Sequence, residues 1–239
     1  MPVHGAGVRL QTARTSPILR RGSGDSGLVT MQTAEDVAAR IVERAGDRRR
    51  IVVGLAGAPG AGKSTLSERL LAALPAGEAA LVPMDGFHFD NAVLDAMGLR
   101  QRKGAPETFD CAGLAATLRR IRSGEGDVAV PVFDRQADLA RAGAAIIPAD
   151  ARFVLVEGNY LLVDRAPWSE LAPLFDLTIF IDVPIAELER RLLARWTDLG
   201  RSEEAARAWV EGNDLPNARL VVEGSRSADI IWKNGFATR

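Results

Sequence analysis

Short runs of consecutive apolar residues alternate along this chain with longer stretches in which apolar residues recur every three or four positions. The short runs end at polar residues or glycines and predict strands over residues 51–56, 79–84, 128–133, 153–156, 177–183 and 228–232. Strands that are apolar at every position are typical of a parallel sheet that is buried on both faces. The pattern therefore predicts an α/β fold, with a mostly parallel sheet and helices on both of its faces.

Helices are predicted where the apolar spacing is helical, over residues 65–74, 111–121, 185–199 and 203–211. Order is expected to begin at Thr33, because Thr33 and Asp36 have the spacing of a capping box. We interpret residues 1–31 as a disordered tail, or as a leader that precedes a true start at Met31; a transit peptide is a further alternative. Residues 32–239 are predicted to form one domain.

Composition and charge limit the function classes. The chain has 239 residues, 47% of them hydrophobic, and is long enough to bury one large core. Its 30 basic and 31 acidic residues give a net charge of −1, so we expect no nucleic-acid or membrane partner. No apolar run has the length of a bilayer span. The single cysteine, Cys111, excludes an intrachain disulfide and favours a cytoplasmic protein; a homodimer is left open.

The segment after the first predicted strand has the pattern of a phosphate-binding P-loop, G-x-x-x-x-G-K-[ST], and reads Gly57-Ala58-Pro59-Gly60-Ala61-Gly62-Lys63-Ser64. Glycines allow the backbone N–H groups of such a loop to turn inward around phosphate oxygens. The start of the helix that follows adds a partial positive charge. We expect Lys63 to reach the β- and γ-phosphates of ATP and Ser64 to bind Mg²⁺, with Thr65 completing the nucleotide contacts.

In open parallel sheets, ligands bind beyond the carboxyl ends of the strands, so the polar residues at those ends are candidate site residues. The second predicted strand ends at Asp85, which is expected to be the catalytic base; a turn-forming aspartate is the alternative. The fourth ends at Glu157, which is expected to be a second ligand of Mg²⁺. His88, Asn159 and Tyr160 lie beside these carboxylates in the sequence and are expected to contact substrate, although each has a structural alternative.

Two further segments are candidates for the substrate side. Asp134 and Arg135 end the third predicted strand and are expected to hydrogen-bond a polyhydroxyl or anionic substrate, with a surface ion pair as the alternative. Residues 211–217 follow the last predicted helix, and Asn213 and Asn217 offer donors and acceptors to a substrate. A turn that ends the helix is the alternative there.

The helix after the fifth strand is basic. Arg191 and Arg195 are four positions apart and share a face of this helix. Phosphoryl transfer needs cations that neutralise charge on the transferring group and a cover that excludes water. We therefore predict a lid over about residues 185–217 in which Arg191 and Arg195 act in catalysis; a solvated basic stripe is the alternative.

The order of the motifs is informative beyond each motif alone. After the P-loop come Asp85-Gly86-Phe87-His88, Arg102-Lys103-Gly104-Ala105-Pro106-Glu107-Thr108-Phe109-Asp110, Pro131-Val132-Phe133-Asp134 and Glu157-Gly158-Asn159-Tyr160. This order resembles the phosphoribulokinase, uridine kinase and pantothenate kinase family of P-loop kinases. It is most similar to a bacterial branch named nucleoside/nucleotide kinase-like, or fructose transport system kinase. The resemblance implies a three-layer P-loop NTPase fold with a helical lid.

The resemblance also implies an activity, the transfer of the γ-phosphate of ATP to a hydroxyl of a small metabolite. It implies that Asp85 is the base and that Lys63 and Ser64 bind the triphosphate and Mg²⁺. It further implies that Glu157 supports the metal and that the helix with residues 190–195 belongs to the lid.

Two departures from the family pattern fall on the substrate side. Uridine kinases carry a tyrosine where His88 stands and a histidine in the region of Arg135. A sugar such as fructose is the acceptor expected from the resemblance, with a nucleoside or pantothenate as the alternative. A P-loop NTPase that acts as a switch or regulator is the alternative from another class. Asp85 and the arginines of the lid favour transfer over hydrolysis alone.

Overall fold

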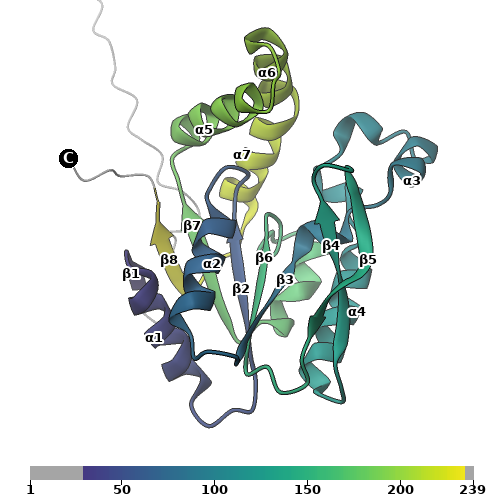
Figure 1. Ribbon diagram of the computed structural model, residues 1–239. Helices are drawn as coiled ribbons and strands as arrows, with labels where there is room; N and C mark the ends of the chain where they lie inside the picture. Colours follow the sequence, from purple (N-terminus) through teal and green to yellow (C-terminus); the bar gives the residue numbers. More distant parts are fainter. Residues whose placement is uncertain (1–28, 235–239) are drawn as a thin grey trace, which may run out of the picture.

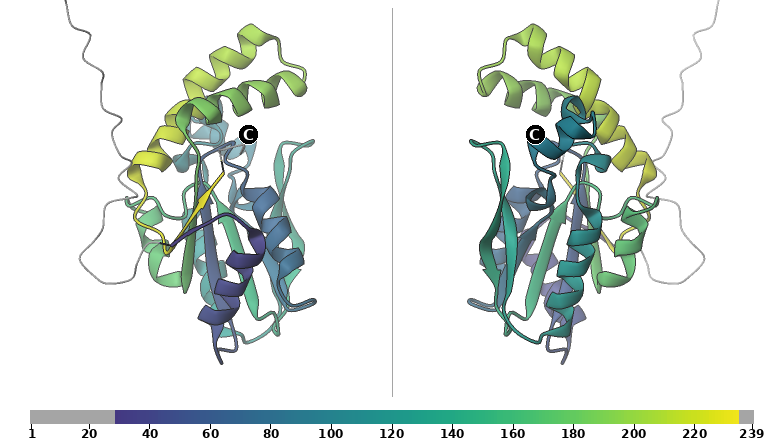
Figure 2. Two further views of the ribbon diagram at one scale, coloured as in Figure 1. Left: turned by 90° about the vertical axis from the view of Figure 1, so that its left-hand side faces the viewer. Right: turned by 90° about the vertical axis from the view of Figure 1, so that its right-hand side faces the viewer.

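The computed structural model describes residues 29–234, in which six strands form a parallel sheet of order β1-β8-β7-β2-β6-β3 (Figure 1). The strands are β1 (Val29–Met31), β2 (Ile51–Gly57), β3 (Ala79–Pro83), β6 (Phe153–Gly158), β7 (Leu177–Asp182) and β8 (Ile230–Lys233). Helices cover both faces, with α1 and α2 on one face and α4 and η5 on the other (Figure 2). Their bounds are α1 (Ala34–Ala45), α2 (Lys63–Ala73), α4 (Cys111–Ser123) and η5 (Trp168–Leu174). The predicted three-layer α/β fold is confirmed.

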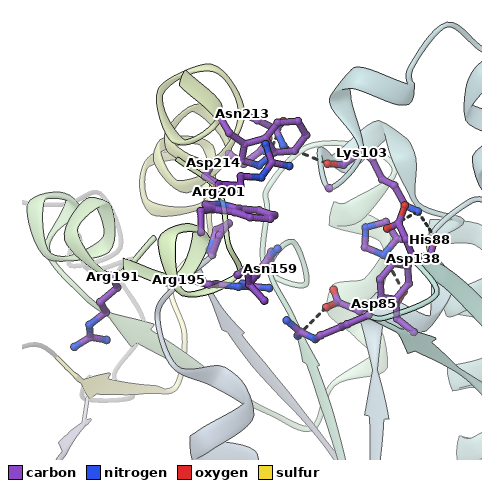
Figure 3. A pocket seen from close by; sticks show the side chains of 18 of the residues that line it. Asp85, His88, Lys103, Asp138, Asn159, Arg191, Arg195, Arg201, Asn213 and Asp214 are labelled. Atoms are coloured by element: carbon purple, nitrogen blue, oxygen red, sulfur yellow. Dashed lines mark hydrogen bonds and ion pairs between the residues drawn. The ribbon is translucent and has the colours of Figure 1, made fainter. Parts of the chain in front are cut away.

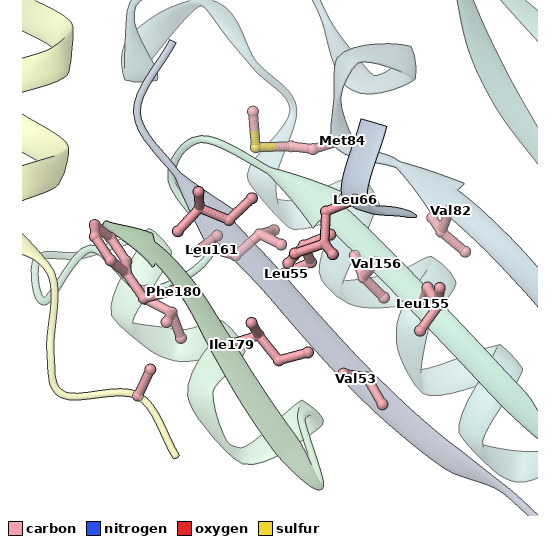
Figure 4. Close-up of a cluster of buried hydrophobic side chains, with 14 of the residues drawn as sticks. Val53, Leu55, Leu66, Val82, Met84, Leu155, Val156, Leu161, Ile179 and Phe180 are labelled. Carbon is pink, nitrogen blue, oxygen red and sulfur yellow. The ribbon is translucent and has the colours of Figure 1, made fainter. Parts of the chain in front are cut away.

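The central strand β2 is buried at every position and pairs with β6 and β7. Figure 4 shows apolar side chains of these strands packed against one another, among them Leu55, Val156 and Ile179, which are fully buried. Burial of each such side chain stabilises the fold by about 1.5–3 kcal/mol. The register sets Ala56 beside Gly158, so the carboxyl ends of the central strands meet at one edge of the sheet.

The predicted strand at 128–133 forms, but it leaves the main sheet. It becomes β4 (Val128–Asp134), which pairs antiparallel with β5 (Leu139–Ile147), a strand that the sequence pattern did not predict. Most positions of β5 are exposed or partly exposed, which removes the apolar run that marked the other strands. The pairing shifts register at Pro131, whose nitrogen cannot donate a ladder hydrogen bond. The resulting hairpin stands beside the sheet edge at β3 (Figure 1).

The first ordered element begins earlier than predicted. Val29–Met31 pairs with β8 as an edge strand, whereas order was expected only from Thr33. The predicted cap is present, because the Thr33 hydroxyl accepts a hydrogen bond from the Asp36 N–H at 3.1 Å. The prediction of a disordered tail otherwise falls on residues 1–28, which lie outside the described residues.

The helices after β7 extend further than the sequence predicted. They are α5 (Ile185–Asp198), α6 (Glu203–Trp209), a π-helical turn at Val210–Asp214 and α7 (Leu215–Gly224). No helix was predicted at 215–224. Pro216 occupies the first turn of α7, where a missing N–H costs nothing. In Figures 1 and 2 these helices lie above the carboxyl edge of the sheet. Within residues 29–234, none of the helices combines the length and apolarity that crossing a bilayer requires.

Short helices complete the carboxyl edge: η2 (Met84–Phe87), α3 (Asn91–Ala96), η3 (Arg100–Arg102) and η4 (Pro106–Thr108). Gly86 lies in η2, and a Cβ atom at this position would overlap the carbonyl oxygen of Pro131 in β4. The absence of a side chain thus lets the hairpin approach the turn that carries Asp85.

We expect Gly86→Ala to lower the free energy of unfolding by about 1–3 kcal/mol, because the backbone of β4 must shift to admit the methyl group. Urea denaturation measures this difference. Gly126→Ala is the matched control, since a Cβ there meets open space. Equal stability of the two variants would contradict the close approach.

Candidate active site

The loop between β2 and α2 has the conformation of a phosphate-binding loop. Gly60 and Gly62 have φ values of 79° and 93°, a region that side chains disfavour. A Cβ on Gly57 would lie 3.1 Å from the Cβ of Ile181, so glycine also permits the close packing of β7. The N-terminus of α2, at Lys63, faces a cavity of about 410 Å³, here termed the phosphate cavity. Its walls include Pro59, Gly60, Gly62, Lys63, Ser64 and Thr65.

Lys63 crosses the phosphate cavity to the strand-end residue Asn159. Its Nζ donates to the carbonyl oxygens of Gly57 and Ala58, at 3.1 and 3.2 Å, and to Oδ1 of Asn159. Burial lowers the pKa of Lys63 to about 8, against the opposing attraction of Asp85 and Glu157. A cation held in so little solvent interacts strongly with any anion that enters the cavity.

This pKa predicts how nucleotide affinity depends on pH. Below pH 8, Lys63 is already charged, so the affinity for ATP should not vary through this group. Above pH 8, the free protein must take up a proton when phosphate binds, and the Kd should rise by up to about tenfold per pH unit. Calorimetry in two buffers of different ionisation enthalpy measures both the Kd and the proton uptake. A constant Kd between about pH 7 and 9.5 would contradict a buried Lys63 beside the phosphates.

Ser64 and Glu157 contact each other at the mouth of the P-loop. The Ser64 hydroxyl donates to Oε1 of Glu157 at 3.3 Å, and the Ser67 hydroxyl donates to Oε2 at 3.1 Å. Burial raises the pKa of Glu157. The charge of Lys63 and the hydrogen bonds from Ser67 and Ser64 partly offset this rise. Within residues 29–234, no group of three or more His, Cys, Asp and Glu side chains has the arrangement of a metal site. An oxygen pair of this kind suits Mg²⁺, which usually takes only one or two protein ligands and completes its shell with phosphate and water.

A second, larger cavity of about 990 Å³ opens from the phosphate cavity, and we term it the acceptor cavity (Figure 3). The residues shared by both cavities are Pro59, Asp85, Arg135, Asn159, Arg191 and Arg195. Asp85, at the start of η2, therefore lies at the junction of the two. The guanidinium of Arg135, from the β4–β5 turn, is 3.6 Å from its carboxylate.

His88 forms part of the wall of the acceptor cavity. Its Nδ1 is 2.8 Å from the Asp85 carbonyl oxygen, and because a carbonyl only accepts, Nδ1 carries the proton. The ring lies between Phe109 and Phe133, with centroids 3.8 and 4.8 Å away. Burial lowers the pKa of His88, so the ring is neutral near pH 7. His88 thus holds the backbone of Asp85, and its Nε2 remains available as an acceptor.

The two predicted lid arginines differ in their contacts. Arg191 donates to Glu187 at 2.7 Å and to the carbonyl oxygen of Asn234 at 3.1 Å, which ties α5 to the end of β8. Arg195 extends toward Asn159 (Figure 3), and burial together with the nearby Arg135 lowers its pKa. Both arginines line both cavities.

Two predicted substrate contacts are corrected by the structure. Asp134 lines neither cavity; its carboxylate accepts from the N–H groups of Gln136 and Ala137 and so shapes the β4–β5 turn. Tyr160 is fully buried, and its hydroxyl donates to the carbonyl oxygen of Gly104. Tyr160 therefore supports Gly104 in the wall of the acceptor cavity, and Asp134 stabilises the turn that follows β4.

Lys103 lines the acceptor cavity and was given no role from the sequence. Its Nζ donates to Oδ1 of Asn91 at 2.6 Å and to the carbonyl oxygen of Asp138 at 2.7 Å, and it lies 5.1 Å from the ring centroid of Phe133. Its own carbonyl accepts from Nδ2 of Asn213, at 3.2 Å, which links the lid region to the opposite wall. Lys103 does not follow a strand, so reading the strand ends did not find it; its place in the quoted motif was the available signal.

A P-loop cavity that opens into a second cavity, with a carboxylate at the junction, defines the class of P-loop kinases. The model of the family described as the Phosphoribulokinase / Uridine kinase family matches residues 52–235. The chain belongs to this family, as its motifs predict, and it is an ATP-dependent small-molecule kinase.

Individual relatives agree with this assignment. The chain is 43% identical over 190 residues to the uncharacterized protein YggC of Escherichia coli (strain K12). This alignment covers 77% of this chain and 78% of YggC. It is 29% identical over 225 residues to a pantothenate kinase of Clavibacter sepedonicus, covering 83% and 70% of the two chains. Among solved structures, a putative fructose transport system kinase from Silicibacter sp. TM1040 superposes with a TM-score of 0.79 at 45% identity, over 84% of this chain and 100% of that one.

Proposed function

We propose that this kinase transfers the γ-phosphate of ATP to a hydroxyl of a sugar or sugar derivative, with fructose as the reference compound. The observation that carries the proposal is the position of Asp85 at the junction of the two cavities. A donor phosphate on the P-loop and an acceptor in the larger cavity both lie against this carboxylate. The name of the Silicibacter relative supports a sugar acceptor.

The proposed reaction is an in-line displacement. The acceptor hydroxyl oxygen forms a bond to the γ-phosphorus while the bond from that phosphorus to the β,γ-bridging oxygen breaks, and ADP leaves. The proton of the hydroxyl passes to Asp85, which acts as general base. His88 holds the backbone at this position through the Asp85 carbonyl, and so positions the base.

Cations along the phosphate cavity stabilise the charge that develops on the transferring group. Lys63 binds the β- and γ-phosphates, and Arg135 and Arg195 approach from the acceptor side. Ser64 and Glu157 would hold Mg²⁺, which would neutralise charge on the phosphate oxygens when bound.

Residues 185–217 act as the lid in this proposal. Arg191 donates to the carbonyl oxygens of Gly60 in the P-loop and of Asn234, and Asn213 donates to the carbonyl oxygen of Lys103. These contacts, on opposite walls of the cavities, support a lid that excludes water from the transferring group.

Acceptor-dependent ADP formation tests the proposal. A coupled assay would screen a panel of sugars, sugar acids, sugar phosphates, nucleosides and pantothenate at fixed ATP and Mg²⁺. We expect stimulation by a sugar or sugar derivative. Stimulation by a nucleoside or by pantothenate alone would replace the sugar with the alternative acceptor. ATP hydrolysis that no member of the panel changes would favour a switch or regulator.

Two finer predictions accompany the proposal. The free, buried Cys111 is compatible with a reducing cytoplasm, where ATP and Mg²⁺ are supplied. The homodimer remains a prediction, which sedimentation in the presence and absence of ATP tests.

A further inference from the structure

Arg201 occupies an unusual place in the wall of the acceptor cavity. It follows Gly200, whose φ of 86° turns the chain between α5 and α6. The carbon of its guanidinium lies 4.6 Å from the ring centroid of Trp196 and 4.7 Å from that of Trp209. The two indoles have centroids 5.8 Å apart and are inclined by 69°, so the cation lies over two rings that meet edge to face.

Within residues 29–234, the guanidinium of Arg201 forms no ion pair, although it attracts the carboxylate of Asp214, which lines the same cavity. The Arg201 side chain forms no hydrogen bond there, and no carboxylate lies within 4 Å of it. Most other cations of the cavity wall are paired: Arg100 with Asp95, Lys103 with Asp138, Arg135 with Asp85, and both Arg190 and Arg191 with Glu187. Arg195 is the other described cation of this wall without such a pair, and it also faces the phosphate cavity. Arg201 lines only the acceptor cavity and not the phosphate cavity.

Arg201 lines the acceptor cavity, so N–H groups that the protein does not use can reach a ligand there. Stacking on indole faces fixes the plane of an arginine and shields its faces from water, while its N–H groups still point outward in that plane. A planar fork of N–H donors matches the oxygens of a carboxylate or phosphate, which it binds with two parallel hydrogen bonds.

Trp209 adds a second donor without an acceptor. Its Nε1 is buried and has no hydrogen-bond partner among the described residues, and Trp209 also lines the acceptor cavity. Nε1 of Trp196, in contrast, donates to Asp214 at 2.6 Å. Because Nε1 of Trp209 is buried, a ligand in the acceptor cavity does not reach it, and Arg201 is the donor of this pair that a ligand can contact.

We propose that the phosphate acceptor carries an oxyanion, either a carboxylate or a phosphate, and that Arg201 is the specificity-determining residue that binds it. The inference rests on the proposed kinase function and narrows it. The acceptor is a sugar acid or sugar phosphate, with its reacting hydroxyl at Asp85 and its anionic group at Arg201, rather than a neutral sugar.

Matched pairs of compounds test this proposal: D-glucose with D-gluconate, D-fructose with D-fructose 6-phosphate, and glycerol with D-glycerate. Binding is followed by tryptophan fluorescence, because an anion at Arg201 changes the surroundings of Trp196 and Trp209. We expect at least one charged compound to bind about tenfold more tightly, or better, than its neutral partner. Tighter binding of D-gluconate or D-glycerate would indicate a carboxylate, and tighter binding of D-fructose 6-phosphate would indicate a phosphate.

Arg201→Gln should raise the Kd of the charged compound by about 10- to 100-fold, the scale of losing a hydrogen bond between charged groups. The Kd of ATP should not change. Arg201→Lys keeps the charge without the fork and should give an intermediate Kd. Arg207→Gln is the matched control, since Arg207 is an exposed residue of α6 whose ion pair with Glu211 is 3.9 Å long. The melting temperature of each variant shows whether the lid still folds.

The inference is overturned if neutral compounds bind as tightly as charged ones, or if Arg201→Gln leaves the affinity for the charged compound unchanged. ADP formation in the same samples separates this failure from that of the proposed function. Turnover of a neutral sugar that is insensitive to Arg201→Gln supports the kinase and contradicts the oxyanion site. Tight binding of the charged compound through Arg201 with no acceptor-dependent turnover supports the site and contradicts sugar phosphorylation.

Discussion

A Lys63→Ala variant should have no measurable ATP turnover. Lys63 joins two carbonyl oxygens of the P-loop to Asn159 at the end of β6, and its charge is buried. Removing the ammonium leaves Asp85 and Glu157 facing the triphosphate without the buried cation that attracts both of them. Loss of one preorganised donor from such a site costs about 10²–10³-fold in rate, and here the repulsion of the two carboxylates adds to that loss.

ADP formation and equilibrium binding of ATP measure this effect. Lys233→Ala is the matched control, because Lys233 is exposed at the end of β8 and lines neither cavity. Full activity of Lys63→Ala would show that the nucleotide does not bind at this P-loop.

Asp85→Asn should reduce kcat by about 10²–10⁴-fold, the usual scale for losing a positioned general base. The amide has the shape of the carboxylate but cannot accept the proton of the acceptor hydroxyl at neutral pH. Asp85 touches the phosphate cavity only at its junction with the acceptor cavity, so the Kd of ATP should stay nearly unchanged. The substitution weakens the ion pair with Arg135, at 3.6 Å. It leaves no buried charge without a partner, because both side chains are exposed.

Single-turnover kinetics and nucleotide binding separate the two roles of an aspartate at this position. Asp164→Asn serves as control, since Asp164 is an exposed residue that pairs with Arg226 and lines neither cavity. Weak ATP binding together with normal turnover at saturating ATP would instead identify Asp85 as a metal ligand.

The sequence predicts the donor half of the site well because the relevant residues follow buried strands. The P-loop comes directly after β2, Asp85 directly after β3 and Glu157 within β6, and parallel pairing brings these strand ends to one edge. The apolar runs fix which strands are central. Loop glycines and a lysine at fixed spacing then leave one plausible geometry for the phosphates.

The acceptor half of the site was harder to predict from the sequence. β4 resembled another strand of the parallel sheet, but its partner β5 is a largely exposed strand without an apolar run, so the hairpin was not expected. Asp134 ends a strand, as predicted, but this strand belongs to the hairpin and not to the parallel sheet. The burial of Tyr160 depends on contacts with the distant residues Gly104 and Phe109, which periodicity along the chain does not report. Arg201 contacts two tryptophans that are close to it in the sequence but belong to separate helices, α5 and α6.

Phosphorus NMR of a complete reaction tests the central claim, that the two cavities form one phosphotransfer site. The protein would be mixed with ATP, Mg²⁺ and the acceptor that stimulates ADP formation most strongly. The account predicts that the γ-phosphate signal is replaced by a phosphomonoester of the acceptor in equal amount to ADP, and that Asp85→Asn slows this conversion. Appearance of inorganic phosphate alone, at a rate independent of the acceptor, would contradict it.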